Sequence, residues 1–232
     1  MPRPLPWLLL PLVLAASPAA AQDASWAACR AAIAAAEPQS GLPPGLLGAI
    51  ALVETGRHDP RSGRVEPWPW SWNAEGEGRA APTREAAVAE VAALLARGVR
   101  SIDIGCMQVN LLHHPAAFAG LAEGFDPAAN IRYAAGFLRE LRARTGDWAQ
   151  AIANYHSGEA ERGLAYHRRV VLARLGAAWA TGGTVPLPVR AMAGTMGGLC
   201  APGLSPVLAI RPVAARRAPA ARPRIACRRA AR

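Results

Sequence analysis

The chain has 232 residues, 52% of them hydrophobic, and a formal net charge of +10. All 26 basic residues are arginine, and nine of these lie in 185–232, which contains no Asp or Glu. The other 17 arginines face all 16 carboxylates in 1–184, so that part of the chain is near neutral. Because the positive charge belongs to a C-terminal segment, it does not indicate a nucleic-acid-binding domain.

Residues 1–21 have the pattern of a cleavable signal peptide. They carry one charge, Arg3, then an apolar run at 7–14, and then Ala19-Ala20-Ala21. The run is too short to span a bilayer, and small residues of this kind precede a cleavage site. We therefore expect a periplasmic protein without a stable membrane span; the alternative is an uncleaved membrane anchor. In an exported chain, the basic tail is expected to meet an anionic wall polymer, a membrane surface or an acidic partner, not nucleic acid.

The cysteines are Cys29, Cys106, Cys200 and Cys227. An even number in an exported chain predicts disulfides, and four cysteines allow three pairings, among which the sequence cannot choose. We favour Cys29–Cys106 within the domain and Cys200–Cys227 within the tail. The pair His113-His114 has no third ligand at a suitable spacing, so we expect neither a metal nor another cofactor.

Apolar periodicity and capping residues predict a mainly α-helical domain at 22–180. Pro43-Pro44-Gly45 opens one helix, Thr83 and Asp147 can cap two others, and Asp126-Pro127 starts the clearest one. The predicted helices span 24–36, 43–54, 84–97, 126–144, 148–156 and 166–175. A small hairpin could form in the 61–80 loop. From 181 to 232 the chain is rich in Pro, Ala and Arg without periodicity, which predicts a disordered, low-complexity tail.

Glu54 is the strongest candidate for a catalytic group. It follows Leu47 by seven residues and Ile50 by four, so it lies on the apolar, core-facing side of its helix. A carboxyl group there is either paired or desolvated with a raised pKa, and the second state makes a general acid near neutral pH. The plainer alternative is a glutamate at a helix end that reaches solvent.

Four short motifs follow one another on this helical background. They are Glu54-Thr55-Gly56, Gly105-Cys106-Met107-Gln108, Asp126-Pro127-x-x-Asn130-Ile131 and Ala153-Asn154-Tyr155-His156-Ser157-Gly158. In order and spacing, from about Leu42 to Leu175, the series resembles the soluble lytic transglycosylases, bacterial relatives of goose-type lysozyme. Two positions depart from that pattern: Thr55 stands where the family usually has Ser, and His156 where it has Asn.

The resemblance implies a lysozyme-like domain that acts, as a monomer, on the glycan strands of peptidoglycan. Glu54 would protonate the oxygen of the β-1,4 bond between N-acetylmuramic acid and N-acetylglucosamine. It would then take the proton of the muramyl C6 hydroxyl, which closes a 1,6-anhydro ring. Substrate binding would fall to Thr55, Met107, Gln108, Tyr155 and His156, with Tyr155 over Glu54 to hold the substrate or the carboxyl group.

Several alternatives stay open. Met107 and Tyr155 are also typical of core packing. The tryptophans of the loop, Trp68, Trp70 and Trp72, suit either stacking on sugars or a small satellite core. A lysozyme-like hydrolase would need a second carboxylate, with Asp103, Glu66, Glu75 and Glu77 as candidates. A wall-binding or scaffold protein is the third class. The tail is also suited to tether the domain to a flagellum or a secretion apparatus.

Overall fold

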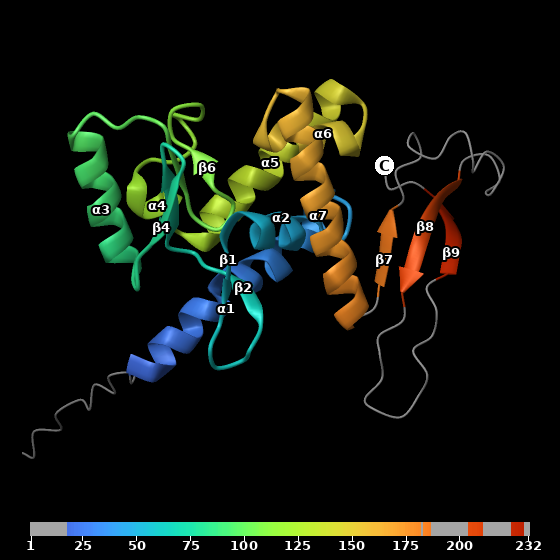
Figure 1. The fold of residues 1–232 in the computed structure, drawn as a ribbon, viewed down its shortest axis with the longest axis horizontal. Coiled ribbons are helices and arrows are strands. Elements are labelled where there is room, and N and C mark those ends of the chain that lie inside the picture. Colours follow the sequence, from blue (N-terminus) through green and yellow to red (C-terminus); the bar gives the residue numbers. More distant parts are fainter. Residues whose placement is uncertain (1–17, 182, 187–203, 211–223, 230–232) are drawn as a thin grey trace, which may run out of the picture.

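In the computed structural model, the described residues are 18–181, 183–186, 204–210 and 224–229. The fold is mainly α with small β elements, as predicted (Figure 1). The helices in this part of the chain are α1 (Pro18–Ala36), the 3-10 helix η1 (Glu37–Gln39), α2 (Leu46–Thr55), α3 (Arg84–Ala96), α4 (Leu121–Gly124), α5 (Pro127–Thr145), α6 (Trp148–His156) and α7 (Ala160–Thr181).

The predicted caps begin three of these helices. The side chain of Thr83 accepts a hydrogen bond from the amide of Ala86, and the carboxylate of Asp147 accepts one from the amide of Gln150. Asp126 caps α5 in the same way, with a proline in the first turn. Each cap satisfies an amide that has no partner within its helix, which confirms these predicted starts.

Two helices begin earlier than predicted. The helix α7 starts at Ala160, not at Tyr166, although Gly163 lies in its first turn. A Cβ at Gly163 would lie 3.1 Å from the Cβ of Ala153, so glycine here lets α7 pack closely on α6 rather than ending a helix. The helix α1 starts at Pro18, inside the predicted signal peptide. Residues 1–17 lie outside the described residues, so the signal peptide stays a prediction.

The main core lies between α1, α2, α5, α6 and α7. Its fully buried members include Leu46, Leu47 and Ile50 of α2, Ile131, Ala134 and Leu138 of α5, and Tyr166 and Val170 of α7. The α5 residues recur at the spacing of one helix face, as the apolar periodicity of a predicted helix requires. None of the helices in the described part of the chain is long and apolar enough to cross a membrane.

A four-stranded antiparallel sheet lies beside α3. The sheet and α3 form the lobe at the left of Figure 1, called the sheet lobe, and the helices of the main core form the helical lobe. The strand order of the sheet is β4 (Glu77–Ala80), β3 (Ser71–Ala74), β5 (Ile102–Ile104), β6 (Val109–Asn110). The strands β3 and β4 form the predicted hairpin, turning at Glu75-Gly76 where both residues have positive φ. A second hairpin pairs β1 (Gly56–His58) with β2 (Val65–Pro67).

Two of the three loop tryptophans are core residues, and the third, Trp70, is partly buried against the satellite core. Trp68 is only 6% exposed and packs on the rings of Trp26 and Trp70. Trp72 is 4% exposed and belongs to the satellite core between the sheet and α3, with Val91, Ile102 and other apolar residues. The core interpretation of the two buried tryptophans is therefore the one that holds.

Disorder was the wrong prediction for parts of the tail. The segments β7 (Gly183–Pro186), β8 (Leu204–Ile210) and β9 (Arg224–Arg229) form a three-stranded antiparallel sheet beside α7 (Figure 1). The run Leu204–Ile210 contains four large aliphatic residues, which the overall composition of the tail concealed. The rest of the tail, including Cys200, lies outside the described residues, so the Cys200–Cys227 pairing stays a prediction.

Candidate active site

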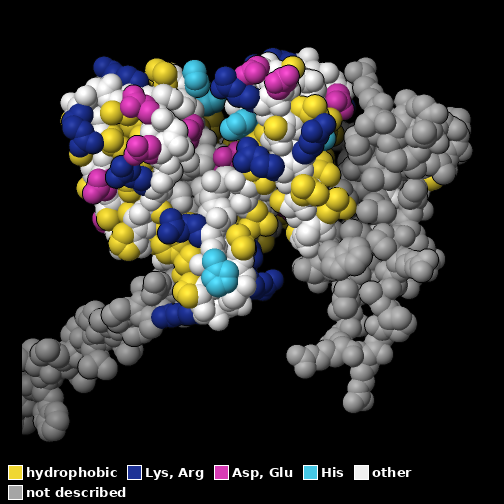
Figure 2. Space-filling view, in the orientation of Figure 1, with side chains coloured by type: hydrophobic (Ala, Val, Ile, Leu, Met, Phe, Trp, Pro, Cys, Tyr) yellow, Lys and Arg dark blue, Asp and Glu magenta, His cyan; other side chains and the backbone are white. Residues whose placement is uncertain are grey.

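A cleft of about 850 Å³ separates the sheet lobe from the helical lobe. Figure 2 shows the surface hollowed between these lobes, with basic, histidine and acidic side chains over α6 and α7. The sheet side of the cleft contributes Asn73, Ser101, Asp103, Gln108 and Asn110, and the helical side contributes Glu54, Tyr133, Phe137, Tyr155, His156, Arg162 and Arg169. A cleft of this volume is within the range of ligand-binding sites in proteins.

Glu54 lines this cleft from the last turn of α2. Leu47 and Ile50, which share its side of the helix, are fully buried, as their spacing predicted. The hydroxyl of Tyr166 on α7 donates a hydrogen bond of 2.5 Å to Oε1 of Glu54. Tyr166 therefore holds the carboxyl group of Glu54 on one side, and Glu54 also faces the cleft.

Burial is the main cause that raises the pKa of Glu54, from an ordinary 4.5 to about 7. The hydrogen bond from Tyr166 and the charge of Arg169 lower the pKa, while the nearby carboxylate of Asp103 raises it further. A carboxyl group with a pKa near 7 is protonated in a large fraction of molecules at neutral pH. It can therefore donate a proton and afterwards accept one.

Sequence reasoning missed Tyr166 and gave its role to Tyr155. The hydroxyl of Tyr155 instead donates to the main-chain carbonyl of Met107, at 2.8 Å, and the two tyrosine rings stack 6.4 Å apart. The available signal was the spacing of Tyr166 and Val170 on one helix face, where a buried tyrosine needs a hydrogen-bond partner. Only the fold reveals that this partner is Glu54, which lies 112 residues away in sequence.

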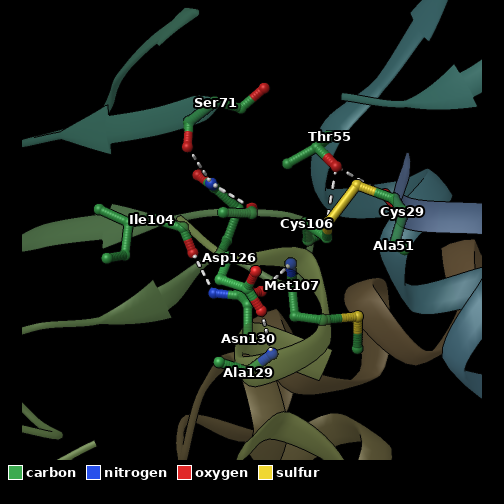
Figure 3. Close-up of a disulfide and its surroundings, with 12 residues drawn as sticks. Cys29, Ala51, Thr55, Ser71, Ile104, Cys106, Met107, Asp126, Ala129 and Asn130 are labelled. Carbon is green, nitrogen blue, oxygen red and sulfur yellow. Dashed lines mark hydrogen bonds between the residues drawn. A yellow bond between two sulfur atoms is a disulfide. The ribbon is translucent and has the colours of Figure 1, made fainter. Parts of the chain in front are cut away.

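The loop Gly105–Gln108 brings Gln108 to the cleft and is held on two sides (Figure 3). Cys106 forms the predicted disulfide with Cys29 of α1. Asn130, which is fully buried, accepts a hydrogen bond from the amide of Met107 and donates to the carbonyls of Ile104 and Gly124. The motif Asp-Pro-x-x-Asn therefore serves to hold the loop that carries Gln108.

Gly105 is required where this loop passes Asn130. Its φ is +78°, and a Cβ there would lie only 2.4 Å from the side-chain nitrogen of Asn130. No side chain other than hydrogen fits this approach, and the positive φ also favours glycine. The Gly-x-Met-Gln spacing thus reflects backbone packing.

Two residues predicted to bind substrate are buried instead. Met107 has no exposed surface and belongs to the main core. Of the two interpretations of this residue, core packing is therefore the one that the structure supports. Thr55 is 5% exposed, and its hydroxyl donates to the carbonyls of Ala51 and Cys106, which ties α2 to the loop (Figure 3). A threonine hydroxyl that is used in this way is not available to a sugar.

Gln108 and His156, by contrast, line the cleft, and substrate binding by them stays a prediction. Gln108 has a φ of +48°, and its side-chain amide donates to the carbonyls of Ser71 and Gly105. His156 stacks almost parallel on the ring of Tyr166, with 4.7 Å between the ring centres. Partial burial, followed by the charge of Arg169, lowers the pKa of His156, while Asp103 raises it.

The comparisons with known proteins agree with this geometry. The family model of the transglycosylase SLT domain matches residues 31–169, more than half of the chain. The protein belongs to the transglycosylase SLT family. No curated protein and no solved structure matches the chain.

The matched range of this SLT domain contains all the site residues named above, from Glu54 to Arg169. The family is that of the lytic transglycosylases, whose substrate is peptidoglycan. Within the described residues of the SLT domain, no group of three or more His, Cys, Asp or Glu could hold a metal ion. His114 has a different role, since its Nδ1 lies 2.8 Å from the hydroxyl of Tyr133 and its ring packs on Phe137.

Proposed function

We propose that the protein is a lytic transglycosylase that cleaves the β-1,4 bond between N-acetylmuramic acid and N-acetylglucosamine without water. The observation that carries this proposal is the carboxyl group of Glu54, which lines the cleft, is held by Tyr166 and has its pKa raised to about 7. Membership of the SLT family supports the substrate.

In the proposed reaction, protonated Glu54 gives its proton to the glycosidic oxygen, and the bond from that oxygen to C1 breaks. The N-acetylglucosamine leaves with a free hydroxyl group. The Glu54 carboxylate then takes the proton of the muramyl C6 hydroxyl, whose oxygen bonds to C1 and closes the 1,6-anhydro ring. Glu54 ends protonated as it began, and no water is consumed. The carboxyl group serves as both general acid and general base.

The test is a digest of purified sacculi by the mature protein, with Glu54→Gln as the matched control. Mass spectrometry of the released muropeptides reads the result. Products that end in 1,6-anhydro-muramyl groups, absent with the variant, are the expected outcome. Products one water heavier would make the protein a hydrolase and contradict the proposal.

The hydrolase is the second candidate, because a further carboxylate lines the same cleft. Asp103 on β5 is partly buried, accepts a hydrogen bond from Asn110 and has its pKa raised mainly by burial. The other carboxylates considered do not line the cleft: Glu66 is buried against Arg30, and Glu75 and Glu77 are exposed. A hydrolase would use Asp103 to activate water or to bond to C1.

We further propose that the protein works in the periplasm, as a monomer, and opens the wall locally for an envelope-spanning machine such as a flagellum or a secretion apparatus. Peptidoglycan as substrate and the predicted signal peptide at 1–21 support this location. The basic residues of 185–232 are the proposed contact with that partner or with wall polymer. Deletion of 185–232 is expected to leave activity on soluble fragments intact but to reduce retention on sacculi or on the partner. Equal retention would contradict the proposed contact.

A further inference from the structure

The helical wall of the cleft carries a cationic group that the proposed reaction does not use. Arg162 and Arg169 both line the cleft, four residues before and three residues after Tyr166 on α7. This spacing places them on the same side of the helix as the tyrosine that holds Glu54. His156, from the end of α6, lies against them on the ring of Tyr166.

Arg169 is the member of this group that forms no ion pair within the described part of the chain. Its guanidinium lies over the ring of Tyr166, 5.4 Å from the ring centre, and the residue is exposed to solvent. No carboxylate among the described residues comes within ion-pair distance of it. Arg162, in contrast, is paired with Glu159. The guanidinium of Arg169, with five N–H donors in a fixed planar arrangement, is therefore available to a ligand beside the catalytic carboxyl group.

The opposite wall has the opposite character. Asp103 lines it together with the neutral side chains of Asn73, Ser101 and Asn110. An anionic substituent that enters the cleft is attracted by the helical wall and repelled by Asp103, so it can lie on one side only. The sugar rings of the glycan are neutral, which leaves the substituents of the muramyl residue as the anionic part of the strand.

We propose that Arg169, with Arg162 beside it, binds a carboxylate carried on the lactyl side chain of the muramyl residue next to the scissile bond. The inference rests on the proposed function and adds the substrate feature that the site selects. A carboxylate held there places the muramyl residue on the correct side of Glu54, because N-acetylglucosamine has no such group. The arginine thus fixes the direction of the strand in the cleft.

The test compares soluble peptidoglycan fragments with the same fragments after their carboxyl groups have been converted to amides. The wild-type protein is expected to prefer the native fragments by about tenfold in kcat/KM, as for one charge-assisted hydrogen bond in a solvated site. Arg169→Gln is expected to lose this preference, mainly through a higher KM. Arg168→Gln is the matched control, because Arg168 is an exposed neighbour outside the cleft lining, and it is expected to keep the preference.

The assay is run across pH, because loss of the Arg169 charge also raises the pKa of Glu54. That effect is the same for both fragments, so only the ratio between them reports carboxylate binding. An equal loss on native and amidated fragments, or a wild-type protein without a preference, would overturn the inference. In native fragments the lactyl carboxyl group forms an amide with the peptide, so the carboxylates belong to the peptide, whereas fragments stripped of peptide carry a free lactyl carboxylate instead. If stripped fragments react like amidated ones, the site requires a carboxylate of the peptide; if they react like native ones, the site also accepts a carboxylate placed directly on the lactyl group.

A binding measurement separates this inference from the proposed function. The Glu54→Gln protein is expected to bind native muramyl peptide about tenfold more tightly than the amidated form, by calorimetry. The double variant Glu54→Gln/Arg169→Gln is expected to bind both alike. Tighter binding of the native peptide without any cleavage by the wild type would keep the carboxylate site and reject the lyase. Equal binding of both peptides by the single variant would overturn the site.

Discussion

The hydroxyl of Tyr166 donates a hydrogen bond of 2.5 Å to the carboxyl group of Glu54. This contact joins the end of α2 to the middle of the cleft-lining face of α7, and it lowers a pKa that burial has raised. The two effects oppose each other, so the pKa of about 7 is a balance that single substitutions can move in either direction.

Tyr166→Phe removes the hydrogen bond that lowers the pKa of Glu54. The pKa of Glu54 then rises above about 7, and since the general acid must be protonated, the alkaline limb of the activity profile moves to higher pH. We also expect the maximal rate to fall by about tenfold, because the carboxyl group loses its support. Profiles of kcat/KM against pH measure both effects. Tyr155→Phe is the control, because that hydroxyl bonds to Met107 rather than to Glu54, and an equal shift there would refute the assignment.

Asp103→Asn is expected to move the same limb in the opposite direction. The negative charge of Asp103 raises the pKa of Glu54, so its removal makes Glu54 a stronger acid and shifts the alkaline limb to lower pH. The products are expected to keep their 1,6-anhydro ends, as shown by mass spectrometry. Complete loss of turnover at every pH would instead favour a hydrolase that depends on Asp103.

Glu54→Gln is expected to stabilise the protein at alkaline pH. Because the folded-state pKa is raised, the folded state holds the proton more tightly than the unfolded chain, and stability is lost as pH rises from 4.5 through about 7. Above that range the charged carboxylate costs up to about 3 kcal/mol. Urea unfolding at pH 5 and pH 8 should show the variant gaining on the wild type only at pH 8. A constant difference would contradict the raised pKa.

Removal of the disulfide tests how the loop that carries Gln108 is held. The bridge joins Cys29 to Cys106 across 77 residues of sequence, so the double variant Cys29→Ser/Cys106→Ser frees a long loop in the unfolded state. We expect the free energy of unfolding to drop by about 4 kcal/mol, measured by urea titration under oxidising conditions. Because the variant keeps Cys200 and Cys227, which are also predicted to pair, a reductant should lower the stability of the wild type by about this amount more than that of the variant. An equal response of the two proteins would contradict a stabilising role for the Cys29–Cys106 bridge.

Gly105→Ala is expected to be more damaging than Gly98→Ala. Both glycines have positive φ, +78° and +89°, so both variants pay a backbone cost of about 1 kcal/mol. A Cβ at Gly98 meets nothing within 4 Å, whereas at Gly105 it meets the side chain of Asn130 at 2.4 Å. We expect a further loss of about 2 kcal/mol for Gly105→Ala, together with lower activity. Equal free energies of unfolding for the two variants would rule out a role for this contact.

Local features of the sequence were sufficient for much of the helical framework. A side chain such as Asp147 caps a helix through the nearest amides, and the spacing of Ile131 and Leu138 repeats with the helix turn. Both signals involve residues close together in sequence, so they do not depend on the tertiary packing around the helix. The same holds for Glu54, whose core-facing position follows from Leu47 and Ile50.

The tail illustrates where composition misleads. The abundance of Pro, Ala and Arg in 181–232 predicted disorder, yet Leu204–Ile210 pairs with strands on both sides. Strand pairing satisfies backbone groups between segments that are distant in sequence, so no property of one segment reports it. The Cys29–Cys106 bridge was favoured among three pairings, and only the fold confirmed it.

By itself, the sequence determined the helices, their caps, the family motifs and the identity of the catalytic candidate, because each depends on neighbouring residues. The tertiary structure decided which motif residues face the cleft. It buried Met107 and Thr55, placed Gln108 at the cleft, and brought Tyr166 to Glu54. Whether a side chain meets solvent, core or a distant partner depends on how elements far apart in the chain pack together, and that information is absent from any local pattern.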